Sequence, residues 1–336
     1  MSTRSSGIDP AAPLVDEGYD VVGDVHGCAD KLVRLLAALG YRQERGAWRH
    51  RTRRVVFLGD FIDRGPYQLD AVAIPRAMVA AGAARAILGN HEFNAVGLAT
   101  GTPGGGWCRP HNRKNLDQTV DFLAAAPFGS STHREIIDWF RTLPLWLDLD
   151  GLRVVHACWH EPSMTLLEPL RSEAGGLTDD LVVQATRRGT PVFEAVKTVL
   201  KGPEAHLDGF THVDTDRHRR AEGRFLWWEP SVTTLRNGVR LPPTTTLYDR
   251  SGAEADRLPD TPLPDKLLAM VPTDPARPPV LFGHYWFTAG DDDSTVQVIN
   301  PKAACLDFSA VSGGPLVAYR WSGERELTSA NLVAVR

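Results

Sequence analysis

Residues 55–65 read VVFLGDFIDRG, an apolar run that ends in a glycine, an aspartate and a charged pair. The apolar residues Val55–Leu58 are typical of a buried β-strand. Gly59 follows directly, and glycine accepts a positive φ and lets the backbone come close to an ion. Asp60 and the Asp63-Arg64 pair therefore stand where a strand ends and a polar ligand can bind.

Four other predicted strands end in a similar way. They are Tyr19–Val22 before GDVHG (residues 23–27), Ala86–Leu88 before GNHE (residues 89–92), Leu152–Val155 before His156, and Val280–Phe282 before Gly283-His284. Ligand sites of open α/β sheets lie outside the carboxyl ends of the strands. We therefore expect the five strand ends to converge, although the chain separates them widely.

Helical patterns lie between the first three strands. Leucines at helical spacing predict a helix up to Leu39 with Gly40 at its end, and an Ala-rich stretch predicts another over 69–81. Pro75 is expected to kink that second helix or to delay its start. Helices that alternate with strands predict parallel strands with crossover helices, an α/β fold or, by some schemes, α+β.

Strand patterns return after residue 144. Leu145–Leu149 and Leu152–Val155 flank Asp150-Gly151, which predicts a hairpin. Further strands are expected at Val296–Ile299, Leu316–Trp321 and Leu332–Val335. Between residues 161 and 278 the sequence predicts one amphipathic helix near 178–201 and otherwise loops. We expect a disordered tail over 1–14 and a single domain over 15–336, with the helical and loop insertion 161–278 capping the active site.

Composition narrows the classes of partner. The 336 residues carry a formal net charge of -4, and the pI of about 6.3 gives no basic surplus for nucleic acid. The sequence has no 18-residue apolar stretch that would predict a membrane span. It also has no apolar core near the N-terminus that would predict a signal peptide. The four cysteines form no CxxC pair, which is typical of free thiols in a protein from a reducing compartment. We expect a cytoplasmic protein with no membrane partner.

The residues at the strand ends form a mixed ligand set of carboxylate, amide and imidazole groups. They are Asp24, His26, Asp60, Asn90, His156 and His284. Such a set of oxygen and nitrogen ligands has intermediate hardness, which favours manganese, with iron or zinc as alternatives, over magnesium or calcium. Two ions about 3.5–4 Å apart need a bridging carboxylate, for which Asp60 is the candidate. Two divalent ions, two carboxylates and a hydroxide leave about one positive charge, to which Arg64 adds another that suits phosphate.

In this order, GDVHG, GDFIDRG, GNHE, VVHA and a final GH resemble the phosphoprotein phosphatase family of calcineurin-like metallophosphoesterases. The Asp-Arg-Gly ending of the second motif favours that family within the superfamily, and the bacterial branch with symmetrical diadenosine tetraphosphatases is most similar. The resemblance covers 15–160 and 279–321. It implies a four-layer fold, a central β-sandwich flanked by helices.

The resemblance also implies residue roles. Asp24, His26 and Asp60 would bind one metal ion, and Asp60, Asn90, His156 and His284 the other. His91 would protonate the leaving oxygen, Asp63 would orient His91, and Arg64 would hold the phosphate. The chain departs from the family pattern at His156-Ala157-Cys158, where His-Gly-Gly is usual, and its second phosphate-binding arginine is not recognisable. Arg220 and Arg224 are candidates, and Arg109, in a Gly-rich loop, is a further candidate for substrate contact.

We therefore expect a hydrolase in which a metal-bridging hydroxide attacks phosphorus directly. The first interpretation is a phosphomonoesterase similar to protein phosphatases, and the alternative is a dinucleoside polyphosphate hydrolase. A nucleic-acid phosphodiesterase is disfavoured by the acidic pI. A catalytically silent metal-binding adaptor would need a missing ligand or acid, and the sequence has all of them. The partner would be a phosphorylated small molecule, nucleotide or phosphoprotein.

Overall fold

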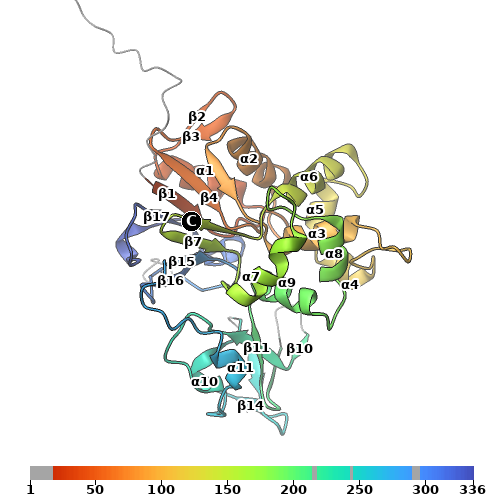
Figure 1. Cartoon of the computed structure of the whole chain (residues 1–336), viewed down its shortest axis with the longest axis vertical. Helices are drawn as coiled ribbons and strands as arrows, with labels where there is room; N and C mark the ends of the chain where they lie inside the picture. The colour runs from red at the N-terminus through yellow and green to blue at the C-terminus, as the bar shows by residue number, and fades with distance from the viewer. Residues whose placement is uncertain (1–17, 214–217, 243–244, 290–295) are drawn as a thin grey trace, which may run out of the picture.

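The computed structural model describes residues 18–213, 218–242, 245–289 and 296–336 (Figure 1). The predicted tail over 1–14 lies outside the described residues. Two mixed sheets form the centre of the molecule, and helices lie on both sides of them. Among the described helices, none combines the length and the apolar character that crossing a bilayer requires.

The first sheet has the strand order β18-β17-β1-β4-β5. Its strands are β1 (Gly18–Val22), β4 (Arg53–Phe57), β5 (Ala84–Ala86), β17 (Leu316–Trp321) and β18 (Leu332–Val335). The strands β1, β4 and β5 are parallel, as the alternating pattern predicted, and β17 and β18 add antiparallel partners. The hairpin β2 (Arg42–Glu44) and β3 (Ala47–Arg49) follows the first crossover helix.

The crossover helices of this sheet are α1 (Ala29–Ala38) and α2 (Gln68–Ala80). Leu32, Leu35 and Leu36 are fully buried on one face of α1. Pro75 lies inside α2, so the expectation that it delays the start of the helix was wrong. A proline in the interior removes one hydrogen bond, and the burial of Pro75, Val72 and Met78 against the core compensates for this loss.

The second sheet has the order β16-β15-β7-β6. Its strands are β6 (Trp146–Leu149), β7 (Leu152–Val155), β15 (Val280–Phe282) and β16 (Ala303–Cys305). The predicted hairpin of β6 and β7 is confirmed, but the predicted strand Val296–Ile299 is wrong, because β16 pairs with β15 in its place. Val296 and Val298 pack on the core outside any ladder, and this burial explains their strand-like alternation.

The two sheets pack face to face as the predicted sandwich. Val21, Val56, Val154, Leu281 and Val317 fill the space between them. Their strand neighbours face the opposite way and pack against helices, because side chains alternate across a strand. Each fully buried aliphatic side chain stabilises the fold by about 1.5–3 kcal/mol. The four-layer architecture expected from the resemblance is confirmed.

Segment 161–278 begins with the helices α7 (Glu161–Leu167), α8 (Asp179–Ala185) and α9 (Pro191–Lys201). The helix predicted near 178–201 is divided into α8 and α9 at Gly189, whose φ is 78°. Buried apolar residues recur along α9 at spacings of three and four, from Val192 to Leu200. Thr190 caps the N-terminus of α9 by accepting a hydrogen bond from the Phe193 amide.

The same segment then forms two small antiparallel sheets where the sequence indicated only loops. One has the order β12-β11-β8 and the other β10-β9-β13-β14 (Figure 1). Their strands are β8 (Glu204–His206), β9 (Thr211–Val213), β10 (Arg219–Arg220), β11 (Glu222–Phe225), β12 (Val239–Arg240), β13 (Thr246–Tyr248) and β14 (Glu254–Ala255). Strands of two to four residues are too short to produce a readable alternation.

The remaining elements are short and lie near these layers. They are α3 (Asn90–Ala99), α4 (Arg113–Asp117), α5 (Val120–Ala125), α6 (Ser131–Thr142), α10 (Leu235–Gly238), α11 (Asp265–Leu268), and the 3-10 turns η1 (Glu168–Leu170), η2 (Ala310–Ser312) and η3 (Ser329–Asn331). The helix α3 matters most for the site, because it begins at Asn90, within the GNHE motif.

Candidate metal centre

The five predicted strand ends meet at one edge of the sandwich. Loops after β1, β4, β5, β7 and β15 bring Asp24, His26, Asp60, Asn90, His156 and His284 together. All of them except His156 line a cavity of about 730 Å³, and His156 lies fully buried behind it. The convergence inferred from strand ends is therefore present in the fold.

Asp60 lies at the centre of this cluster. Its Oδ2 atom is 3.4 Å from His26 Nε2, 3.5 Å from His156 Nε2 and 3.9 Å from His91 Nε2. Two groups have ligand atoms within 4.8 Å of one another: His26 with Asp60 and His91, and Asp60 with His156 and His284. Asp60 belongs to both groups, which is the position a bridging carboxylate needs.

Backbone carbonyls orient two of the imidazoles. His26 Nδ1 lies 2.9 Å from the carbonyl of Ile62, and His156 Nδ1 lies 2.7 Å from that of Leu58. A carbonyl only accepts, so each Nδ1 carries a proton, and each Nε2 is directed at Asp60, where it can bind a metal ion once it is unprotonated. Imidazole ligands of metals in proteins have this arrangement of a fixed outer nitrogen and a free inner one.

Asp24 provides the clearest test of whether the site fits a cation. Its Oδ2 accepts a hydrogen bond from the His284 amide at 3.1 Å, while its buried Oδ1 has no hydrogen-bond partner among the described residues. Burial, and then the nearby Asp307 carboxylate, raise the pKa of Asp24 well above its usual range. A buried carboxylate oxygen without a partner is costly, and a divalent cation would satisfy it. The residues therefore fit metal ions.

The pKa values of the histidines divide them by role. Burial, with Arg64 and Arg224 respectively, holds the pKa values of His26 and His284 well below the usual range, so both imidazoles are neutral, as metal ligands must be. Burial alone would lower the pKa of His156, but Asp60 and Asp24 outweigh it and raise that pKa to about 10. A metal ion would displace this proton, because only neutral imidazole binds metals.

Two glycines leave room for the carboxylates. A Cβ atom on Gly283 would lie 2.0 Å from Asp24 Oδ1, and one on Gly89 would lie 2.2 Å from Asp60 Oδ1. Three of the candidate ligands also adopt left-handed backbone conformations, with φ of 43° at His26, 50° at Asp60 and 67° at His284. Strain of this kind is typical of functional loops, which the surrounding fold holds in place.

Glu92 anchors the Asp60 loop, a role that we had not assigned from the sequence. Its fully buried carboxylate accepts hydrogen bonds from the amides of Gly89, Asp60 and Phe61 at 3.0, 2.7 and 2.8 Å. Burial, and then Asp60, raise its pKa to about 7. The available signal was its position as the third residue of a helix that starts at Asn90, where glutamate closes a capping box.

His91 lines the cavity, and Asp63 fixes its Nδ1 atom. Asp63 Oδ2 is 2.5 Å from His91 Nδ1, and Asp63 Oδ1 accepts a hydrogen bond from the Thr119 hydroxyl at 2.9 Å. His91 Nε2 therefore faces Asp60, whose Oδ2 lies 3.9 Å away. Arg64 lies beside it, with Nη1 3.4 Å from His26 Nε2 and Nη2 3.5 Å from His91 Nε2. Its guanidinium stacks over Trp286 at 4.8 Å.

The structure separates the other arginine candidates. Arg224 lines the same cavity as Arg64 and donates to the His284 carbonyl at 2.8 Å, and its burial lowers its pKa. Arg220 lines both this cavity and a neighbouring one, whereas Arg109 lines only the neighbour. Trp286 and the buried Asp307 were missed, because neither belongs to a motif.

A model of the calcineurin-like phosphoesterase family matches residues 19–247. The chain belongs to this family. It is a metallophosphoesterase, and hence a hydrolase of a family that uses divalent metal ions. The resemblance drawn from the five motifs is thus confirmed at the level of family and fold.

Two curated relatives carry related names. A bis(5'-nucleosyl)-tetraphosphatase PrpE, asymmetrical, from Halalkalibacterium halodurans is 42% identical over 206 residues, which are 59% of this chain and 80% of the relative. A symmetrical bis(5'-nucleosyl)-tetraphosphatase from Vibrio cholerae is 25% identical over 94% of this chain and 98% of its own. Among solved structures, a protein serine/threonine phosphatase from Saccharomyces cerevisiae aligns with a TM-score of 0.48 at 12% identity, over 97% of this chain and 80% of its own.

Proposed function

We propose that this metallophosphoesterase hydrolyses dinucleoside polyphosphates at a two-metal site centred on Asp60. The observation that carries the proposal is the membership of Asp60 in two cation-holding groups, in a cavity that also contains Arg64 and Arg224. The sequence motifs alone favoured a phosphomonoesterase similar to protein phosphatases. Relatives named as symmetrical and asymmetrical tetraphosphatases favour the alternative, and we adopt it.

The ligands divide around Asp60. Asp24 and His26 would join it at one ion, and Asn90, His156 and His284 at the other. When bound, the ions supply Lewis-acid charge to the phosphate oxygens and lower the pKa of the water that attacks phosphorus. The mixture of carboxylate, amide and imidazole donors favours manganese, with iron or zinc as alternatives.

The two arginines would bind the reacting phosphate. Arg64 faces the cavity with no carboxylate partner among the described residues, and stacking on Trp286 limits its rotamers. A planar guanidinium binds two phosphate oxygens at once, which fixes the phosphorus for in-line attack. Arg224 would add a second positive charge from β11, on the side of His284.

His91 would protonate the leaving oxygen. Asp63 holds Nδ1, so that the proton on Nε2 is directed into the cavity, and Thr119 holds Asp63 in turn. Such a positioned acid typically contributes about 10²–10⁴-fold to the rate. We also propose that segment 161–278 caps the site, because Lys201, Glu204, Glu222 and Arg224 of this segment line the cavity.

A substrate panel with manganese tests this function. We expect a dinucleoside tetraphosphate to give a kcat/KM at least about 100-fold above those of an aryl phosphomonoester, a phosphodiester and a phosphopeptide. A preference for the phosphopeptide or the monoester would contradict the proposal and restore the first interpretation. Failure on all four substrates with the metal sites filled would favour a silent adaptor.

A further inference from the structure

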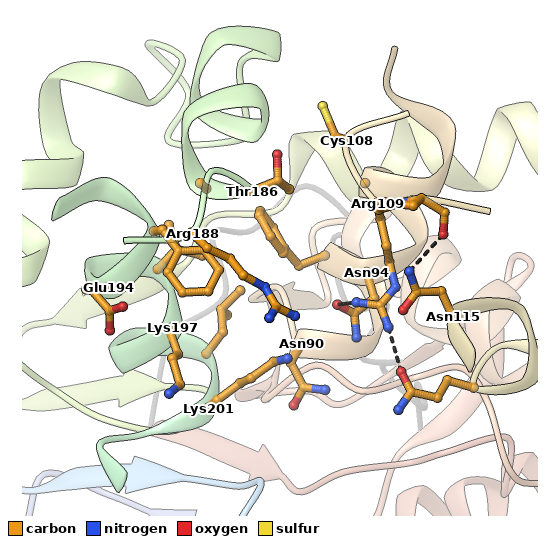
Figure 2. Close-up of a pocket in the computed structure, with 18 of the residues that line it drawn as sticks. Asn90, Asn94, Cys108, Arg109, Asn115, Thr186, Arg188, Glu194, Lys197 and Lys201 are labelled. Carbon is orange, nitrogen blue, oxygen red and sulfur yellow. Dashed lines mark hydrogen bonds between the residues drawn. The ribbon is translucent and has the colours of Figure 1, made fainter. Parts of the chain in front are cut away.

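A second cavity, of about 960 Å³, continues from the metal cavity, and we call it the annex. Asn90, Asn94 and Lys201 line both cavities. Asn90, a candidate ligand, therefore lies at the junction of the two cavities. Further residues of α3, such as Phe93 and Gly97, line the annex beyond it. Figure 2 shows Arg188 and Lys201 reaching into the annex from one side and Arg109 from the other.

Basic side chains outnumber acidic ones around the annex, six to three. Lys197 is neutralised by Glu204, whose carboxylate lies 2.7 Å from its amine. Arg109, Arg188 and Lys201 have no carboxylate within ion-pair distance among the described residues. They come from three places in the chain: the loop before α4, the loop between α8 and α9, and the last residue of α9.

Arg109 is held in place by neutral groups. Its guanidinium donates to Asn94 Oδ1 at 2.8 Å and to Gln118 Oε1 at 2.5 Å, and its buried Nε has no partner among the described residues. The Arg109 amide donates to the Gly97 carbonyl at 2.9 Å. A Cβ atom added to Gly97 would lie 3.2 Å from the Cβ of Arg109, so the two backbones are close. The loop is thus fixed to α3 in a way that orients this charge without neutralising it.

Arg188 and Lys201 complete a set of three like charges. The side chain of Arg188 is exposed, and neither side chain makes a hydrogen bond or ion pair with the described residues. Burial, and then the positive charge of Arg109, lower the pKa of Lys201 to about 8. Like charges gathered in a partly buried cavity destabilise the free protein, and a polyanion that binds between them relieves the repulsion.

We propose that the annex binds the phosphate chain that leads away from the attacked phosphorus, and that Arg109, Arg188 and Lys201 contact its oxygens. This inference rests on the proposed function and identifies which part of the molecule selects the substrate. A phosphomonoester has no such chain and fills only the metal cavity. An oligophosphate spans the junction at Asn90 and meets three cations, two of which can bind oxygens through a bidentate fork.

The first test uses inorganic tripolyphosphate as a competitive inhibitor of aryl phosphate hydrolysis, at a fixed free manganese concentration. Arg188→Gln should weaken inhibition about tenfold, since one charge-assisted contact is lost. Arg109→Gln should do the same, and Arg188→Gln is the safer variant because that side chain is exposed. The control is Arg42→Gln, exposed on β2 and lining neither cavity, which should leave inhibition unchanged. If Arg188→Gln and Arg109→Gln both match this control, the inference is overturned.

A second measurement separates this inference from the proposed function. We compare the kcat/KM for a dinucleoside tetraphosphate with that for the aryl phosphate, and expect the ratio to fall about tenfold in Arg188→Gln but not in Arg42→Gln. If the wild type does not cleave the dinucleotide but tripolyphosphate inhibition still depends on Arg188, the proposed function fails and the annex site stands. If the wild type cleaves it and the ratio is the same in the wild type, Arg188→Gln and Arg42→Gln, the annex site fails alone.

A third experiment identifies whether a nucleotide or a free polyphosphate supplies the phosphate chain. Adenosine triphosphate that inhibits at least as tightly as tripolyphosphate, with the same dependence on Arg188, identifies a nucleotide as the ligand. Inhibition by tripolyphosphate alone identifies a free polyphosphate. Both results support the site, whereas inhibition by both compounds that is equal in Arg188→Gln, Arg109→Gln and the wild type contradicts it.

Discussion

The metal cavity and the annex are built in opposite ways. In the metal cavity, strand ends hold the candidate ligands, and polar groups fix them from behind: the Glu92 carboxylate fixes the Asp60 loop, and the carbonyls of Ile62 and Leu58 fix the outer nitrogens of His26 and His156. In the annex, loops and a helix end carry charges whose partners are neutral or absent among the described residues. The rigid metal cavity suits catalysis, which needs fixed geometry, and the annex, built from loops and a helix end, suits selection of the substrate.

His91→Asn should produce the largest change that is confined to the metal cavity. We expect kcat to fall by about 10²–10⁴-fold for alkyl or nucleotide leaving groups and much less for an activated aryl phosphate. Inhibition by tripolyphosphate should stay at the wild-type level, because His91 does not line the annex. Equal losses with both kinds of leaving group would argue against the acid role and leave His91 as a third candidate ligand beside His26 and Asp60.

Gly283→Ala should weaken metal binding without removing a ligand. Its Cβ atom would lie 2.0 Å from Asp24 Oδ1, so the carboxylate must move. We expect metal affinity to fall by about 10–100-fold, as for changes next to a ligand, with a matching loss of activity that excess metal partly restores. The control is Gly104→Ala, whose Cβ atom would meet no atom within 4 Å. Wild-type metal affinity in Gly283→Ala would contradict the placement of Asp24.

Lys201→Met should reveal the cost of the annex charges. With a folded pKa of about 8 against about 10.5 in the unfolded chain, the unfolded state binds more protons between these values, so wild-type stability rises with pH there. Below pH 8 the buried charge is a constant penalty. The variant should therefore have the higher Tm at pH 7, and its advantage should shrink from pH 8 to 10.5. An advantage independent of pH would show that Lys201 is not charged in this cavity.

Trp286→Phe should produce the smallest change. Trp286 stacks under Arg64 at 4.8 Å, and phenylalanine keeps the shape but offers a weaker cation–π contact. We expect KM to rise about twofold to fivefold for all substrates, because Arg64 would hold the phosphate they share. Trp159→Phe, under Arg153 at the same distance of 4.8 Å and away from both cavities, is the matched control. An equal effect of the two variants would argue against the phosphate role of Arg64.

The same contrast explains how much the sequence could predict. Candidate ligands such as Asp24 and Asp60 follow apolar strands and glycines, so the local sequence pattern indicates where they lie in the fold. The sandwich itself follows from alternating strands such as Val21-Val22 and Val154-Val155. Val296–Ile299 has the same alternation, but its valines are partly buried without joining a sheet, because an alternating pattern indicates burial on one side and not strand pairing.

The annex had no comparable signal. Arg188 and Lys201 are basic residues near a helix end, and nothing local distinguishes them from a solvated surface. Their meeting with Arg109 depends on how α8 packs against both α3 and α9, which is a tertiary relation. The sheets over 204–255 were missed because strands of two to four residues show no period. In our proposal the choice of substrate depends on these parts, which is why the sequence motifs favoured phosphomonoesters first.

The most direct test of the central claim is the metal content of the purified protein and of Asp60→Asn, with the fold of both checked by circular dichroism. If Asp60 bridges two ions, the wild type binds two manganese ions per chain, and the variant loses both together with at least about 10³-fold of the activity. A wild type that binds a single ion, or a folded Asp60→Asn that keeps two ions and full activity, would contradict the account.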